Sequence, residues 1–171
     1  MKKIYLSLLA LIMCSLSACL KDKPAVDFST VGTIIEILPV NGGGLENFDA
    51  AELTFSESGT TDTAMVILNI ASPKPLNKSL TISLEVNDAL RIAYNSANQD
   101  QYDALPDSTF SFPVKSGTIP AGQRLDTVRV YFYPSKIDPT KNYMLPISIK
   151  DAQGETISGN FGSIYFHTNA Q

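Results

Sequence analysis

The sequence contains no tryptophan, one histidine and two cysteines among its 171 residues. The histidine, His167, lies near the carboxyl terminus, and the carboxylates do not recur at a spacing typical of an acid–base pair. Since most catalytic sites need a positioned nucleophile or base, we expect that the protein is not an enzyme. The absence of tryptophan also removes the largest ring on which a sugar can stack, so an aromatic sugar platform would have to use tyrosine.

Both cysteines lie in an amino-terminal segment that has the layout of a secretory signal. Two lysines precede an apolar run over residues 4–13, which is too short to cross a bilayer. The end of the segment, residues 16–19 (LSAC), resembles the lipobox of bacterial lipoproteins, whose cysteine is acylated and becomes the first residue after cleavage. We therefore expect residues 1–18 to be a signal peptide and Cys19 to be the lipidation site. The alternative is an ordinary signal peptide that is cut after Ala18.

Acylation of Cys19 would attach the protein to a membrane without a transmembrane helix, because two acyl chains suffice to hold a protein there. Leu20 stands where lipoproteins retained in the inner membrane carry Asp, so we expect an outer-membrane protein. Residues 19–32 show little periodicity, which is typical of a tether. Cys14 would leave with the signal peptide, so the mature protein is expected to contain no disulfide.

The remaining residues, 33–171, are enough for one domain with its own core. The formal net charge of the chain is -4 at pH 7. An acidic protein attracts the phosphate backbone poorly, so nucleic acid is not an expected partner.

The sequence of this domain predicts β-strands over most of its length. The clearest strand covers residues 79–86, where apolar and polar side chains alternate. The apolar set expected to face the core is Leu80, Ile82, Leu84 and Val86. Residues 88–95 follow a potential cap at Asn87 or Asp88 and predict one short helix. Turn-forming residues separate the other expected strands, which cover 33–38, 53–55, 64–70, 109–114, 124–133, 143–149 and 162–168. The pattern predicts an all-β fold, an antiparallel β-sandwich of seven to eight strands with one short helix.

Three motifs follow one another along the domain: YN..N...Y..LP at residues 94–106, IPAG at 119–122 and DP...Y.LP at 138–146. In this order they resemble a Bacteroidetes lipoprotein domain, domain-of-unknown-function family 1735, over residues 33–168. The resemblance implies an immunoglobulin-like β-sandwich on the cell surface, facing the exterior, which is often encoded with polysaccharide-uptake proteins or attached to glycan-binding and glycan-cleaving domains. It implies no catalytic residues. Gln99 stands where the family commonly has Gly, and Gln disfavours the left-handed turn that Gly permits.

An oxygen-rich cluster near the expected helix contains Asn95, Asn98, Asp100 and Asp103. Calcium needs six or more oxygen ligands, and this segment lacks the glycine that the usual calcium loop places at its sharp turn. We therefore expect a solvated polar loop, with no metal and no cofactor. Nearby Tyr94 and Tyr102 are expected to bury their rings against the sandwich.

A strand over residues 127–133 would bury every second side chain, namely Val128, Val130 and Phe132. The candidate ligand-binding residues Arg129, Tyr131 and Tyr133 then lie in a row on the opposite face. Such a row could stack against a sugar and hydrogen-bond it. Cross-strand pairing on a solvated sheet face explains the same residues equally well.

Two functions are therefore compatible with the sequence. The first is a non-catalytic accessory module that binds polysaccharide or oligosaccharide at the outer membrane during polysaccharide capture. The second is a structural or interaction subunit that packs on another outer-membrane protein without contacting sugar. Binding to immobilised polysaccharides would distinguish them.

Overall fold

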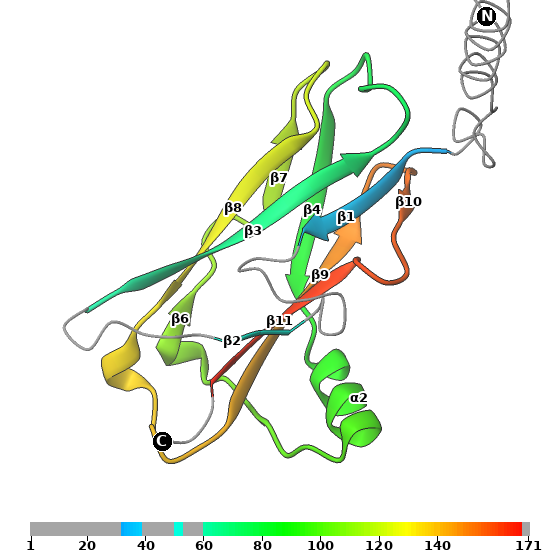
Figure 1. Ribbon diagram of the computed structural model, residues 1–171. Helices are drawn as coiled ribbons and strands as arrows, with labels where there is room; N and C mark the ends of the chain where they lie inside the picture. Colours follow the sequence, from blue (N-terminus) through cyan, green and yellow to red (C-terminus); the bar gives the residue numbers. More distant parts are fainter. Residues whose placement is uncertain (1–31, 39–49, 53–59, 169–171) are drawn as a thin grey trace, which may run out of the picture. The chain divides into compact units, whose positions relative to one another are not determined.

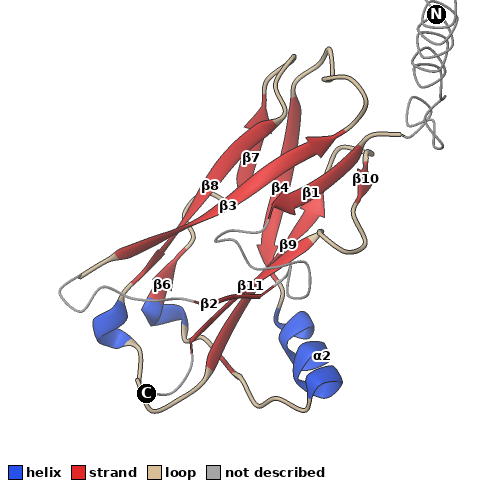
Figure 2. Ribbon diagram, viewed as in Figure 1, coloured by secondary structure: helices blue, strands red, loops and turns tan. Residues whose placement is uncertain are grey.

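The computed structural model describes residues 32–38, 50–52 and 60–168, which form two β-sheets and one α-helix (Figures 1 and 2). The predicted all-β sandwich with one short helix is confirmed. Cys19, the signal peptide and the expected strand over residues 53–55 lie outside the described residues, so these remain predictions. No helix in the described part of the chain is long and apolar enough to cross a membrane.

The first sheet has the strand order β10-β1-β3-β8-β6. Its strands are β1 (Ile34–Leu38), β3 (Asp62–Ala71), β6 (Phe110–Ser111), β8 (Leu125–Phe132) and β10 (Thr156–Ile157). Strand β3 pairs antiparallel with β1 on one side and with β8 on the other. The second edge of β8 pairs with β6 through Tyr131 and Phe132 alone. Among the described residues, the remainder of that edge therefore has no partner strand.

The second sheet has the strand order β2-β11-β9-β4-β7, and β5 pairs with β9 in addition. Its strands are β2 (Ala50–Glu52), β4 (Leu80–Val86), β5 (Asp103–Ala104), β7 (Ser116–Ile119), β9 (Tyr143–Asp151) and β11 (Ser163–Thr168). Strand β9 pairs antiparallel with β11 and with β4. Strand β5 pairs parallel with the start of β9, which β4 does not reach. Residues that lie some forty positions apart thereby become neighbours at this end of the sheet.

The two sheets share one apolar core. Leu80 and Ile82 of β4 are fully buried, and Leu84 is almost so, as their alternation predicts. The rings of Phe132 on β8 and Phe166 on β11 meet with centroids 5.8 Å apart, which joins the two layers directly. Rings in this edge-to-face arrangement add to the stabilisation that burial provides.

Val86 does not face the core as the alternation predicted, because its side chain is 36% exposed. It is the last residue of β4, next to Asn87, where the chain turns into the helix. Its place at the end of the strand puts it outside the cluster of buried residues that the two sheets share. The inward periodicity of β4 therefore ends at Leu84.

The helix α2 (Asp88–Asn98) covers the outer side of the second sheet, against β9. This cover explains why the first seven residues of β9 are all buried, whereas a strand with one solvated face would alternate. Asn87 occupies the N-cap position, but its side chain points to the Ser148 hydroxyl instead of capping the helix. The helix extends three residues beyond the predicted end and closes with Gln99 in the left-handed region at φ 59°.

The other differences from the expected strands concern short strands. The strand expected over residues 109–114 is reduced to β6 (Phe110–Ser111) and is preceded by a 3₁₀ turn at Asp107–Thr109. The described residues contain eleven strands instead of seven to eight, because two- and three-residue strands add to the long ones. Three of these short strands, β2, β5 and β10, pair parallel with a long one. Such pairings depend on tertiary contacts and carry no periodic sequence signal.

Candidate functional site

Strand β8 presents the predicted row of ligand-binding residues only in part. Val128, Val130 and Phe132 are buried, as predicted. Arg129 and Tyr131 therefore lie on the outward face, where Arg129 is exposed and Tyr131 is half-buried. Two residues apart on one face, they are neighbours along the strand.

Tyr133 lies beyond the end of β8. The strand ends at Phe132, and Tyr133 is the residue that precedes a 3₁₀ turn at Pro134–Lys136. Its backbone N–H donates to the carbonyl of Thr109 at 2.8 Å, and the ammonium of Lys136 lies 4.7 Å from the centre of its ring. A ring that already carries a cation over one face is a less available platform than a free ring.

Arg129 and Tyr131 line a hollow of about 210 Å³ beside the open edge of β8. Pro113 and Val114, in the segment that crosses from β6 in the first sheet to β7 in the second, and Ser116, the first residue of β7, also line it. Val114 is 57% exposed although it is apolar. The hollow thus combines an aromatic ring, a guanidinium group and an apolar rim.

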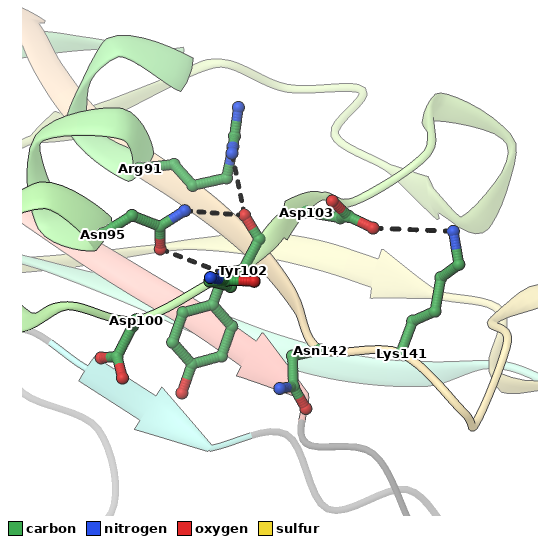
Figure 3. A pocket seen from close by; sticks show the side chains of 8 residues that line it. Arg91, Asn95, Asp100, Tyr102, Asp103, Lys141 and Asn142 are labelled. Carbon is green, nitrogen blue, oxygen red and sulfur yellow. Dashed lines mark hydrogen bonds and ion pairs between the residues drawn. The ribbon is translucent and has the colours of Figure 1, made fainter.

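A second and larger hollow, of about 410 Å³, lies between α2, β5 and the turn before β9 (Figure 3). The residues around it are polar or charged: Arg91, Asn95, Asp100, Gln101, Tyr102, Asp103, Lys141 and Asn142. Asp103 and Asn142 come together because β5 pairs with β9, and the N–H of Asp103 donates to the carbonyl of Asn142 at 2.9 Å. The sequence alone did not predict a site for Arg91, Lys141 or Asn142.

The wall of this second hollow is held by the backbone of Tyr102. The Asn95 side chain donates to the Tyr102 carbonyl at 2.9 Å and accepts from the Tyr102 N–H at 3.1 Å. Arg91 donates to the same carbonyl at 2.8 Å. Figure 3 shows these bonds converging on one residue. Three bonds from a helix to one residue of the following segment fix its position relative to α2.

The guanidinium of Arg91 is also paired with a carboxylate. Its Nε and Nη2 donate to the two oxygens of Asp88 at 2.6 and 2.9 Å, one helical turn away. The hydrogen bond with Arg91 is the main cause that lowers the pKa of Asp88 below its ordinary value. The same bond raises the pKa of Arg91. Arg91 is therefore bound both to Asp88 and to the Tyr102 carbonyl, so its role in the hollow is structural.

Tyr94 and Tyr102 lie where the sequence predicted, with their rings against the sandwich. The Tyr94 ring lies 5.4 Å from that of Tyr165 and 6.1 Å from that of Tyr102, and the Tyr102 ring lies 5.5 Å from that of His167. Tyr165 and His167 belong to β11. This aromatic layer fastens α2 and the segment after it to the outer face of the second sheet.

The residues of the oxygen-rich cluster make separate interactions and do not converge on one point. Asn95 holds Tyr102, and the Asn98 side chain donates to the carbonyl of Tyr94 at 3.0 Å. Asp103 contacts Lys141 at 3.6 Å. In the part of the chain that the structure describes, no group of three or more His, Cys, Asp or Glu residues is placed to hold a metal ion. The arrangement is suited to hydrogen bonding with a polar ligand.

Solved structures similar to this chain come from Bacteroides and share its fold at low sequence identity. A Bacteroides ovatus protein named as a candidate carbohydrate-binding protein is 12% identical, with a TM-score of 0.63 over 80% of this chain and 36% of its own. EndoBT-3987 from Bacteroides thetaiotaomicron, solved with a Man5GlcNAc product, is 18% identical, with a TM-score of 0.55 over 71% of this chain and 28% of its own. The chain thus corresponds to less than half of each of these proteins.

Another similar structure bears on the family. It is a multidomain protein including DUF1735 from Bacteroides ovatus, 14% identical, with a TM-score of 0.64 over 78% of this chain and 44% of its own. No curated protein matches the sequence. A family model described as an N-terminal domain matches residues 38–156, which is well over half of the chain. The chain therefore belongs to this family of N-terminal domains. The resemblance to domain-of-unknown-function family 1735 is consistent with this match and with the similarity to the multidomain protein.

Proposed function

We propose that the protein is a non-catalytic accessory module that binds glycan at the bacterial surface, through Arg129 and Tyr131. The observation that carries the proposal is the position of these two side chains, which are neighbours on the outward face of β8 and line the same hollow. Tyrosine offers a ring face and a hydroxyl, and arginine offers several hydrogen-bond donors. Similarity to proteins named for carbohydrate or glycan supports the choice of ligand.

The anchor is part of the same proposal. Acylated Cys19 would hold the module on the outer membrane, facing the exterior, with residues 19–32 as the tether. A module that captures glycan from outside the cell needs this position. Mass spectrometry of the native protein should find an acylated residue 19 at the amino terminus, and Cys19→Ala should move the protein from the membrane fraction to the soluble fraction.

The glycan proposal is tested by titrating the full chain, held in detergent, with a panel of neutral oligosaccharides. A shallow site with one principal ring should bind in the micromolar to millimolar range, roughly -4 to -8 kcal/mol. Tyr131→Ala and Arg129→Ala should each weaken binding, while Tyr133→Ala should weaken it less because that ring lies beyond the strand, under Lys136. If the panel gives no binding to the parent protein, the proposal fails.

A second function, that of an interaction subunit, is favoured by one observation. Met65 lies opposite Arg129 on β3 and is 44% exposed, and Leu125, on the same outward face of β8, is 53% exposed. Exposed apolar side chains beside an open strand edge suit a protein partner. Replacing Met65 with a photo-crosslinking residue in cells should then give one discrete adduct with an outer-membrane protein.

A further inference from the structure

The hollow between α2, β5 and the turn before β9 has a rigid wall. Tyr102 is held there by Arg91 and Asn95, and its ring packs on His167 of β11. Asp103 is held by the pairing of β5 with β9. A ligand that enters this hollow would therefore find its backbone wall already in place, so little conformational entropy would be lost on binding.

The side chains at the rim of the hollow, in contrast, make only weak interactions with one another. Lys141 and Asp103 approach only to 3.6 Å, and their side chains are 53% and 64% exposed. Strong charge-assisted hydrogen bonds are about 2.7–2.9 Å long, and an exposed pair of this kind stabilises the fold little. Asp103 and Lys141 can therefore turn to a ligand at small cost. Asp100 adds an exposed carboxylate to the same rim.

The charges around the hollow point to an uncharged ligand. Among the lining residues Arg91 is already bound to Asp88 and to the Tyr102 carbonyl, which leaves the cation of Lys141 and the carboxylates of Asp100 and Asp103 for a ligand. An anion would be repelled by the carboxylates, and a cation would meet Lys141. A hydroxyl group both donates and accepts, so a ligand rich in hydroxyls can give hydrogen bonds to the carboxylates and accept them from the ammonium and the amides. The volume of about 410 Å³ lies in the range of small-molecule sites.

We propose that this hollow is a second carbohydrate-binding site, which takes the end of a neutral oligosaccharide: its hydroxyls donate hydrogen bonds to the carboxylates of Asp103 and Asp100 and accept one from the ammonium of Lys141. The inference rests on the proposed function, because it assigns a further sugar contact to a glycan-binding module. It differs in mechanism from the Arg129–Tyr131 site, where a ring contributes. The two sites would engage separate parts of one long chain or two different chains.

The test uses the full chain in detergent, titrated calorimetrically with short neutral manno-, gluco-, galacto- and xylo-oligosaccharides. The rim variant combines Asp103→Asn with Lys141→Ala. Its matched control combines Glu85→Gln with Lys150→Ala, which removes an ion pair of the same 3.6 Å length and comparable exposure outside the hollow. Tyr131→Ala reports on the other site. The melting temperature of each variant is measured to check that the fold is retained.

We expect the rim variant to bind the best oligosaccharide about tenfold more weakly than the parent, a loss of about 1.4 kcal/mol, and the control to bind as the parent does. If the rim variant binds with the parent's affinity while Tyr131→Ala does not, the second site is refuted and the proposed function stands. If the parent binds no oligosaccharide of the panel, both the second site and the proposed function are refuted. Equal weakening in the rim variant and its control would show a general effect of charge and would also refute the site.

Discussion

Asn95 and Tyr102 form a closed pair in which one side chain satisfies both backbone groups of the other residue. The Asn95 amide donates to the Tyr102 carbonyl at 2.9 Å and accepts from the Tyr102 N–H at 3.1 Å. The pair closes the segment after α2 onto the helix, seven residues back along the chain. It gives a physical reason for Asn at position 95 of the YN..N...Y..LP motif, whereas the Tyr at position 102 is explained by its ring, which packs near Tyr94 and His167.

Asn95→Ala should destabilise the domain by about 1–3 kcal/mol, because it leaves two partly buried backbone groups of Tyr102 without this partner. Urea unfolding followed by circular dichroism measures the loss. Asn98→Ala is the control, since it removes one exposed bond to the Tyr94 carbonyl at 3.0 Å and should cost less. Equal losses in the two variants would contradict the role given to the pair.

Ile82→Ala and Leu84→Ala should each cost about 2–5 kcal/mol, as truncations in a packed core do. Both side chains are buried on β4. Val86→Ala on the same strand should cost under about 1 kcal/mol, because Val86 is 36% exposed and lies outside the core cluster. The urea-unfolding midpoints of the three variants provide the comparison. If Val86→Ala lost as much unfolding free energy as Ile82→Ala, Val86 would belong to the core and the assigned end of the buried face would be wrong.

Gln99→Gly should stabilise the domain by up to about 1 kcal/mol. Gln99 holds φ 59°, a conformation that costs side-chain-bearing residues about 1–2 kcal/mol, part of which the greater freedom of glycine in the unfolded chain offsets. Gln153→Gly is a matched control with φ 53°. The Gln153 side chain accepts a hydrogen bond from the Thr81 N–H at 3.0 Å, so this variant should gain less or lose stability. If Gln99→Gly raised the melting temperature no more than Gln153→Gly does, the result would contradict this account.

Asp88 should make the stability depend on acid pH. Its pKa is lowered in the folded state, chiefly by the hydrogen bond with Arg91, so its contribution is complete above the unfolded value of about 4 and is lost as the pH falls through the lower folded value. Asp88→Asn should therefore be less stable than the parent at neutral pH, and the difference should shrink below about pH 4. Because Asp88 is largely exposed, the effect should be small.

The acid dependence is measured as the difference in unfolding free energy between parent and Asp88→Asn across the pH range. Taking the difference removes the contributions of the other carboxylates. A difference that stays constant down to strongly acid pH would mean that the ion pair does not stabilise the fold.

The sequence by itself determined which strands carry one buried face. Alternation with a period of two residues places Leu80, Ile82 and Leu84 inward because successive side chains of a strand point to opposite faces, whatever the strand pairs with. The same argument placed Val128, Val130 and Phe132 in the core. The motifs were also sufficient to indicate the family.

Only the tertiary structure decided where each face ends and which segments meet. The alternation runs through Val86 and Tyr133, yet Val86 is exposed and Tyr133 lies beyond its strand, because burial depends on where the surrounding structure stops. The hollow lined by Arg91, Asp103 and Lys141 exists because β5 pairs parallel with β9 beyond the end of β4. That pairing joins residues some forty positions apart, and no local pattern records it, since a two-residue strand has no period.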